Sequence, residues 1–296
     1  MASTLFPEAY HWGGLRYFEK LAATKHANSE SWWIVLLVEN REDSIGYFEV
    51  VHFRNGMVLS RTEYNVIPYT PILDIDNLGQ LNFSPSGDKL ALQLGRGPIV
   101  LFDFNRCTGA VSNPVDLTYS AQWDASNAAE SQLGSSFSPD GKVYYACNRD
   151  SLYQWHMDDL GNYKRQLIWA DSNKYGLLNN MQLGPNGKIY IAQSLYDNFE
   201  FNGVFRQDTL NDYLGVINYP DSIGLTCDFE IKGFELLGGQ IWSLYGGARG
   251  LGLPNFPNYR LGKLEPQERL TISDTSLCPD SALQIGLEEV VPFKYE

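Results

Sequence analysis

Apolar residues along this chain fall in short runs that are separated by turn residues. The runs recur from Trp32 onwards and are rich in β-branched and aromatic side chains. Runs of this kind, bounded by Gly, Pro, Asn and Asp, predict β-strands. No stretch longer than about twelve residues keeps the 3.6-residue period of an amphipathic helix. The pattern therefore predicts an all-β fold.

One phrase occurs three times and organises these strands. The copies are Phe83–Lys89 (FSPSGDK), Phe137–Lys142 (FSPDGK) and Leu183–Lys188 (LGPNGK), and successive copies are 54 and 46 residues apart. Proline presets φ for the second position of a type I turn, and glycine suits a position where φ is positive. Each copy is therefore predicted to be a hairpin turn. The spacing is typical of repeats that stack to bury their hydrophobic faces.

The predicted strands group into four-stranded units, the size of one propeller blade. The first unit begins at Trp32, the second at Leu81 and the third at Gly134, while a degenerate fifth unit covers Gly233–Pro254. In the fourth unit the predicted strands are 181–183, 189–192, 203–205 and 214–217. A segment around Leu15–Phe18 would contribute to a sixth unit. We predict a β-propeller of antiparallel blades, with five or six in this chain, either a full ring or an incomplete seven-bladed one.

A change of composition after Leu261 predicts a domain boundary. Pro266 and a polar run indicate a linker, and Leu270–Cys278 begins a new strand-like segment. Roughly 25 residues cannot bury a core of their own. We assign residues 1–264 to the propeller, with the first 20 or so as a partial blade. Residues 265–296 are assigned to a linker and the start of a truncated β-sandwich domain, with a tail packed on the propeller as the alternative.

Composition excludes several classes of partner. The net charge is −13, and the 22 Lys and Arg residues are scattered, whereas nucleic-acid binders concentrate them on one face. The longest apolar run, Trp32–Val38, is seven residues, far short of the roughly 20 that span a bilayer. The first residues lack the basic and apolar regions of a signal peptide, so either the protein is cytosolic or its true start is missing. We expect neither nucleic-acid binding nor membrane insertion.

Cysteine spacing leaves the redox compartment open. The four cysteines, Cys107, Cys147, Cys227 and Cys278, are too widely spaced for a disulfide scaffold or a zinc site. Cys107 and Cys147 could approach each other across neighbouring units. The sequence does not decide whether they form a disulfide.

Candidate ligand-binding residues each have a simpler structural interpretation. Trp32 and Trp33 resemble a carbohydrate-stacking platform, but neighbours on a strand face opposite sides, so at least one is expected in the core. His26, His52 and His156 lie near three different predicted units, and a propeller channel can gather one metal ligand from each blade. Their positions within the units do not correspond, so we expect structural hydrogen bonds and no metal site.

The candidate catalytic residues also have simpler structural interpretations. Asp103 and Asp140 could form a carboxylate pair for glycoside chemistry, but Asp140 lies in a predicted turn and Asp103 near a strand end, where structural roles are expected. Gly246–Gly252 is rich in glycine but lacks the Gly-Lys-Ser/Thr ending of a phosphate loop. No nucleophile elbow and no Cys/His pair with nucleophile spacing is present. We predict no catalytic residue, no metal and no cofactor, and the ligand-binding residues stay unassigned.

Seven phrases occur in the order that one family shows. They are Lys25–Asn28 leading to Trp32–Val35, Leu101–Gly109, Phe137–Lys142, Leu152–Trp155, Gly187–Ala192, Leu214–Pro220 and Gly252–Phe256. Together they resemble the N-terminal β-propeller, with WD40-like repeats, of large secreted Bacteroidetes proteins of the type IX secretion, gliding-motility-associated type. The resemblance implies an extracellular or cell-surface location, further blades and a signal peptide ahead of the chain, and Ig-like or PKD-like domains after it.

The chain also departs from that family. Ser29-Glu30-Ser31 stands where the family commonly has Gly-Arg-Asp, and no C-terminal sorting domain is present. We expect a non-enzymatic binding or scaffold module that presents a propeller face to a glycan or protein, through the 118–131 and 195–202 connections. The alternative is a propeller-type lyase or glycoside hydrolase with convergent acidic or His side chains at its channel. A third possibility is a purely structural spacer.

Overall fold

The described part of the chain is built from four small antiparallel sheets. The computed structural model describes residues 15–40, 45–65, 79–95, 97–118, 132–148, 150–157, 163–171, 178–193, 213–236, 253, 257 and 261–264. Within these residues, sixteen strands form four sheets of four strands each, and the strand order in each sheet follows the sequence. This is the organisation of propeller blades. The predicted all-β fold and its four-stranded antiparallel blades are confirmed.

The first and second blades contain the N-terminal half of the strands. The first comprises β1 (Leu15–Lys25), β2 (Trp32–Asn40), β3 (Ile45–Arg54) and β4 (Met57–Tyr64). The second comprises β5 (Leu81–Phe83), β6 (Lys89–Gln93), β7 (Ile99–Phe104) and β8 (Val111–Asp116).

The third and fourth blades follow the same order. The third comprises β9 (Gln132–Phe137), β10 (Val143–Asn148), β11 (Ser151–Met157) and β12 (Tyr163–Ala170). The fourth comprises β13 (Leu178–Leu183), β14 (Ile189–Gln193), β15 (Tyr213–Ile217) and β16 (Phe229–Glu235). A 3₁₀ helix, η4 (Gly224–Cys227), connects β15 to β16.

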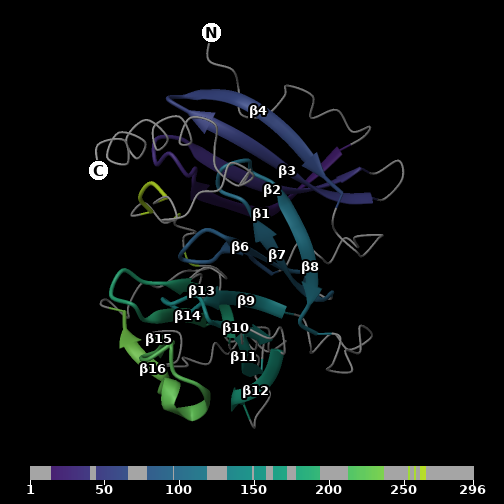
Figure 1. The fold of residues 1–296 in the computed structure, drawn as a ribbon. Helices are drawn as coiled ribbons and strands as arrows, with labels where there is room; N and C mark the ends of the chain where they lie inside the picture. The colour runs from purple at the N-terminus through teal and green to yellow at the C-terminus, as the bar shows by residue number, and fades with distance from the viewer. Residues whose placement is uncertain are drawn as a thin grey trace, which may run out of the picture.

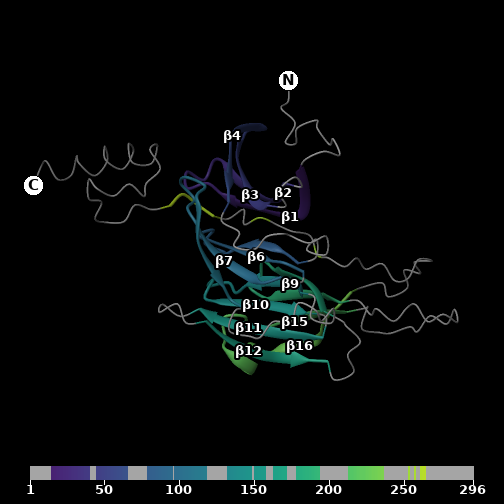
Figure 2. The same ribbon diagram turned by 90° about the vertical axis from the view of Figure 1, so that its right-hand side faces the viewer.

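The blades stack face to face around their first strands. Figures 1 and 2 show the first blade at the top, the second beneath it, and the third and fourth at the bottom. Strand β1 contacts β5, β5 contacts β9, and β9 contacts β13. The last strands, β4, β8, β12 and β16, are mostly exposed. The first strands are therefore the inner strands of the propeller and the last are the outer ones.

The blade count differs from the prediction of five or six. In the described residues there are four blades. The Leu15–Phe18 segment belongs to β1, which pairs with β2 and completes the first blade. Residues 233–235, predicted to open a fifth unit, form the end of β16. The other predicted strands of that fifth unit lie outside the described residues.

The strand assignment within the fourth blade is also corrected. Strand β15 (213–217) pairs directly with β14 and is the third strand, where we predicted residues 203–205, which lie outside the described part. The fourth strand is β16, which pairs with β15. The connection between β15 and β16 folds back onto the third blade. There Tyr145 Oη donates a hydrogen bond to Pro220 O (2.8 Å), and Gly224 N donates to Gln154 Oε1 (2.7 Å). This tertiary contact has no local sequence signal.

The three repeated phrases form the predicted turns. Each follows an inner strand, and the glycine N–H donates to the carbonyl three residues earlier: Gly87 to Ser84 (2.9 Å), Gly141 to Ser138 (3.0 Å) and Gly187 to Gly184 (3.1 Å). The three glycines have φ of 75°, 72° and 78°, a region that other residues rarely adopt. The turn prediction is confirmed at all three positions.

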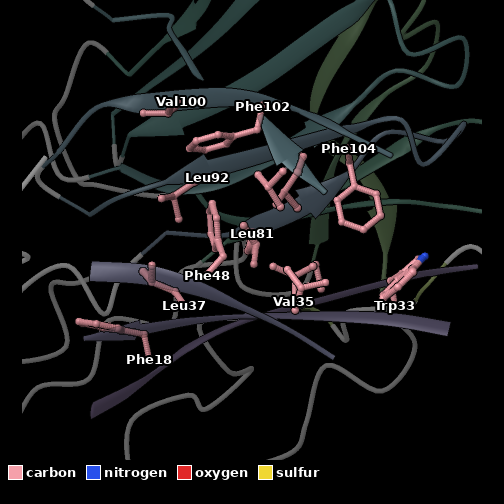
Figure 3. Packing of buried hydrophobic residues seen from close by; sticks show 14 of the residues in the cluster. Phe18, Trp33, Val35, Leu37, Phe48, Leu81, Leu92, Val100, Phe102 and Phe104 are labelled. Carbon is pink, nitrogen blue, oxygen red and sulfur yellow. The ribbon is translucent and has the colours of Figure 1, made fainter. Parts of the chain in front are cut away.

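The core between the first two blades is aromatic. Phe18, Trp33 and Phe48 from the first blade face Phe102 and Phe104 from the second (Figure 3). The rings of Phe48 and Phe102 meet edge to face with centroids 5.1 Å apart. Such pairs stabilise beyond the area that they bury. The prediction that at least one of the paired tryptophans is core is confirmed, because Trp33 is buried.

Smaller side chains fill the interface between the third and fourth blades. Its buried members are Val143, Tyr145, Cys147, Leu152, Ile168, Leu178, Met181, Ile189, Ile191, Ile217 and Cys227. The Cys147 thiol is free and donates to Asn179 O (3.2 Å), and burial raises its pKa to about 12. The conceivable Cys107–Cys147 disulfide therefore does not form.

The chain returns to the first blade after the fourth. Leu264 N donates to Ala27 O (3.0 Å), and the Arg106 guanidinium donates to Gly262 O (2.8 Å). Residues 261–264 thus lie against the loop between β1 and β2. The predicted domain at 265–296 lies outside the described residues and stays a prediction. In the part of the chain that the structure describes, no helix has the length and hydropathy to cross a bilayer.

Candidate functional site

The inner strands of all four described blades enclose a central cavity of about 580 Å³. This volume lies within the usual range of ligand pockets, roughly 300–1,000 Å³. Each inner strand contributes its C-terminal end and the residues just beyond it. The described lining is Ala22, Ala23 and Thr24 from β1, Asn82 to Pro85, Ser136, Phe137 and Pro139, Met181 to Pro185, Gly187, and Pro257.

The repeated turns form part of this lining. Pro85, Pro139 and Pro185 occupy equivalent positions in the three phrases, and all three line the cavity. A turn whose φ is fixed by proline and glycine is rigid before any ligand arrives. The sequence repeat therefore places a preformed, apolar wall around the centre of the propeller.

Most polar groups of the lining are used within the protein. Ser84 Oγ donates to Asp88 Oδ1 (2.9 Å), and Ser136 Oγ donates to Phe137 O (3.2 Å). The Thr24 hydroxyl is buried without a hydrogen-bond partner. A Cβ added at Gly87 would lie 2.5 Å from the Thr24 hydroxyl oxygen. The Ser84 and Ser136 hydroxyls are thus engaged in bonds within the protein, and the Thr24 hydroxyl is buried.

Two amide side chains of the lining use only their nitrogen in hydrogen bonds within the protein. Asn82 Nδ2 donates to Ser135 O (2.8 Å) and to Ser135 Oγ (2.9 Å), and Gln182 Nε2 donates to Leu183 O (3.1 Å). Neither Asn82 Oδ1 nor Gln182 Oε1 accepts a hydrogen bond in the described structure. The cavity therefore offers two amide oxygens as acceptors.

Gln80 ties the inner strands together behind the cavity. Its Oε1 accepts from Ser135 N (2.8 Å) and Met181 N (2.9 Å), and its Nε2 donates to Met181 O (3.1 Å). One buried side chain from the second blade thus joins the third and fourth. Gly134 lies so close to Asn179 O that a Cβ would stand 2.1 Å from this oxygen, so no larger residue fits there. The cavity wall is fixed by these contacts.

The described lining contains no titratable side chain. The nearest acidic turn residue in the sequence is Asp140, which is exposed. Partial burial would raise its pKa, but hydrogen bonds from Ser138, Lys142 N and Asp221 hold that pKa below its usual value. Burial and the negative charge of Asp140 raise the pKa of Asp221. Asp221 accepts a hydrogen bond from Asp140 N (2.9 Å), and neither residue is among the described lining residues.

The two aspartates proposed as a carboxylate pair belong to separate local contacts. Asp103 on β7 pairs with Lys89 and accepts a hydrogen bond from Asn113 Nδ2 (2.7 Å). Asp140 accepts from Ser138 Oγ (2.6 Å) and Lys142 N (2.9 Å) inside its turn. The interpretation of both as turn and strand-end residues is confirmed.

The histidines are placed differently from the prediction. His26 and His52 belong to the same blade, with stacked rings 4.9 Å apart, and Trp33 stacks on His52 at 4.4 Å. Asn28 N donates to His26 Nδ1 (3.0 Å). Burial, the neighbouring His26 and the charge of Arg54 lower the pKa of His52. His156 lies alone on β11 of the third blade, so three different units do not each contribute one histidine.

The two connections expected to bind a partner, residues 118–131 and 195–202, lie outside the described residues except for Thr118. The Gly246–Gly252 segment also lies outside them. Sequence reasoning missed the amide acceptors Asn82 and Gln182. A signal for them exists. Asn82 and Gln182 each directly precede a copy of the repeated phrase. Aligning the copies would therefore have placed both residues around the same axis.

Comparisons with known proteins concern only the fold. No protein-family model and no curated protein matches this chain. A solved structure from Bacteroides uniformis, described as a 6-phosphogluconolactonase, is 16% identical, with a TM-score of 0.37 over 69% of this chain and 57% of its own. The periplasmic gluconolactonase PpgL of Pseudomonas aeruginosa is 11% identical, with a TM-score of 0.39 over 62% and 49%. This chain thus spans about half the length of these structures.

A third similar structure is the β-propeller domain of Cps50 (Swd1) from Myceliophteria thermophila. It is 9% identical, with a TM-score of 0.36 over 72% of this chain and 70% of its own. At such identities the similarity extends to the fold alone. The class that the strands and their arrangement define is a β-propeller.

Proposed function

We propose that this chain is a non-enzymatic binding module that holds a glycan or protein partner at the central cavity of its propeller. The observation that carries the proposal is the cavity itself. All four inner strands line it, the repeated turns make its wall rigid, and its described lining has no titratable side chain. A rigid apolar pocket with a few polar groups is the usual form of a binding site.

The same observation weighs against the enzyme alternative. A lyase or glycoside hydrolase needs convergent acidic or histidine side chains in the channel. Asp103, Asp140 and His156 are all absent from the described lining. The resemblance to secreted Bacteroidetes proteins supports a location outside the cell, in which the propeller would serve as a surface module for a larger protein.

The test is to block the cavity and to measure binding. Immobilised protein would be screened against neutral glycan and peptide arrays, in parallel with Leu183→Arg and Ala23→Trp, which place a charge or a bulky ring in the cavity. Leu59→Arg on the exposed outer strand β4 is the matched control. Binding that only the two cavity variants lose supports the proposal. Binding unaffected by these variants, or no binding at all, would overturn it, and a chemically altered partner in mass spectra would favour an enzyme.

A further inference from the structure

We propose that the ligand of the central cavity is an uncharged peptide segment carrying prolyl or aliphatic side chains, with backbone N–H groups that donate to Asn82 and Gln182. This inference rests on the proposed binding function and specifies its ligand class. Three features of the cavity lead to it, namely its charge, its hydrogen-bonding capacity and the shape of its apolar wall.

The ligand is uncharged because the described lining has nothing to neutralise a charge. None of the described lining residues is Asp, Glu, Lys, Arg or His. A charged group that enters such a cavity loses its hydration and gains no ion pair, which is costly. The net charge of −13 over the chain disfavours an anionic ligand further.

Hydrogen bonding requires a ligand that donates. Asn82 Oδ1 and Gln182 Oε1 accept no hydrogen bond, while their amide nitrogens are bound to Ser135 and Leu183. Backbone donors in the wall are already used, and the unpaired Thr24 hydroxyl is buried against Gly87. Ser84 N donates to Lys89 O (3.0 Å), and Gly184 N donates to Lys188 O (2.8 Å). The wall therefore offers acceptors and few donors.

This balance favours a peptide over a sugar. A sugar hydroxyl both donates and accepts, and its oxygens would find few donors in this wall. A sugar ring also binds well on an open aromatic face, but Phe137 is only 2% exposed, and Phe83 is partly buried with its ring packed edge to face with Phe104 at 4.8 Å. A peptide can place an aliphatic side chain against Pro85, Pro139 and Leu183 and turn its carbonyls to the solvent at the mouth. Burying such a side chain contributes favourably to binding.

The test uses the full chain and a neutral apolar dye, N-phenyl-1-naphthylamine, whose fluorescence rises in an apolar cavity. Competitors are an equimolar pool of acetylated, amidated tripeptides of Val, Leu and Pro, a matched pool containing Asp, and maltotriose. We expect the uncharged pool to displace the dye at concentrations about tenfold lower than either other competitor, the ratio that a single well-made apolar contact supplies.

Gln182→Met separates the hydrogen bond from the apolar contact. Methionine keeps the length of the side chain but removes the acceptor, so the inhibition constant of the uncharged pool, corrected for the dye affinity of the same variant, should weaken about fivefold. Leu183→Arg should abolish dye binding, and Leu59→Arg should leave it intact. Circular dichroism and thermal melting of each variant would establish that it is folded.

The outcomes separate this inference from the proposed function. If dye binds but maltotriose displaces it as well as the peptides do, the cavity is a glycan site, and the peptide inference is wrong while the binding function stands. If the Asp pool competes equally, the uncharged lining does not select, and the inference is also wrong. If Gln182→Met has no effect on displacement, the acceptor role is wrong. If Leu183→Arg leaves dye binding unchanged, the cavity is not the site and both proposals fail.

Discussion

The interface between the first two blades and the interface between the last two are held together in different ways. The first is aromatic, with Phe48 and Phe102 in edge-to-face contact, and Trp33 and Phe104 in the same geometry at 6.4 Å. At its edge, Arg106 donates to Lys25 O (2.8 Å), His26 O (3.4 Å), Ser86 O (3.4 Å) and Gly262 O (2.8 Å).

The second interface has an aliphatic core and a polar network. Gln154 Nε2 donates to Tyr145 Oη (2.7 Å) and Ser222 O (2.7 Å), and Gln154 Oε1 accepts from Gly224 N. This network recruits the loop between β15 and β16 into the interface. The comparison teaches that equivalent repeats need not use equivalent contacts. Where the buried core is mainly aliphatic, with Trp169 and Phe229 meeting edge to face in its partly buried part, a neighbouring loop and its backbone groups complete the packing.

The largest expected effect is on the aromatic interface. Phe102→Ala removes a side chain that is 1% exposed, so we expect a loss of about 3–5 kcal/mol in the free energy of unfolding. Urea denaturation followed by tryptophan fluorescence would measure it. Met57→Ala, at a position that is 57% exposed, should change stability by less than about 0.5 kcal/mol. A similar loss for both variants would show that the aromatic contact is unimportant.

Arg106→Met should have the second largest effect on the free energy of unfolding. Methionine replaces much of the apolar stem but removes the guanidinium bonds to four backbone carbonyls, of which His26 O keeps a bond from Ser29 N (2.9 Å), and we expect a loss of about 3 kcal/mol. Hydrogen exchange at the amides of Ala27 and Leu264, which bond Arg106 O and Ala27 O, should accelerate in this variant. The control is Arg54→Met, which removes an exposed ion pair with Glu30 and should cost at most about 1 kcal/mol. An unchanged exchange rate at the Leu264 amide would show that Arg106 does not hold residues 261–264 against the first blade.

Gln154→Met tests the polar network of the second interface. It leaves Gly224 N without a partner and Ser222 O with only the longer bond from Tyr145 Oη (3.4 Å), so we expect a loss of about 1–3 kcal/mol and faster proteolysis within residues 218–228. Lys164→Met on the exposed face of β12 is the control and should leave both unchanged. If Gln154→Met reduced stability no more than Lys164→Met does, side-chain packing alone would hold this interface.

The smallest effect concerns the pH dependence of the turn at Asp140. The pKa of Asp221 is raised by burial and by Asp140, so protonation of Asp221 favours the folded state, and this contribution is lost as pH rises through its folded pKa. The pKa of Asp140 is lowered, so its contribution is present at neutral pH and lost as pH falls through its folded pKa.

Asp221→Asn keeps an oxygen for the bond from Asp140 N (2.9 Å) and removes the repulsion. We expect stability at pH 7 to rise by about 0.5 kcal/mol, the scale of an exposed charge pair, and the gain to disappear in acid. Thermal melts from pH 3 to pH 8 would measure this. A gain that persists at pH 3 would mean that charge is not its cause. Lys142→Met, in the same turn, checks for a general charge effect.

Local chemistry explains why the strands and turns were predictable. Proline and glycine at Pro139 and Gly141 fix the turn without help from the rest of the fold, and the apolar runs on either side can only be strands. The fourth blade was misassigned because its pairing depends on Gln154 and Tyr145, which hold residues 218–228 from another blade. The single proline and the single glycine of that loop, Pro220 and Gly224, imitate the turn residues of a unit boundary.

The candidate site was predictable only in outline. A central channel follows from any propeller, but the free amide oxygens of Asn82 and Gln182 depend on where their nitrogens bond. The stack of His26 on His52 depends on the register of β3 against β2, which places His52 opposite Trp33. Neither follows from the spacing of residues along the chain.

The contact between Arg106 and Gly262 joins residues that are 156 positions apart. Each blade consists of hairpins that close locally, whereas this contact must wait for the rest of the chain, and long loops close slowly. At roughly 5–20 residues per second of synthesis, the guanidinium is made some 8–30 s before its last acceptor. During this time the edge between the first two blades is open to solvent, to proteases and to chaperones. Residues 261–264 therefore set the moment at which the first two blades become fully protected.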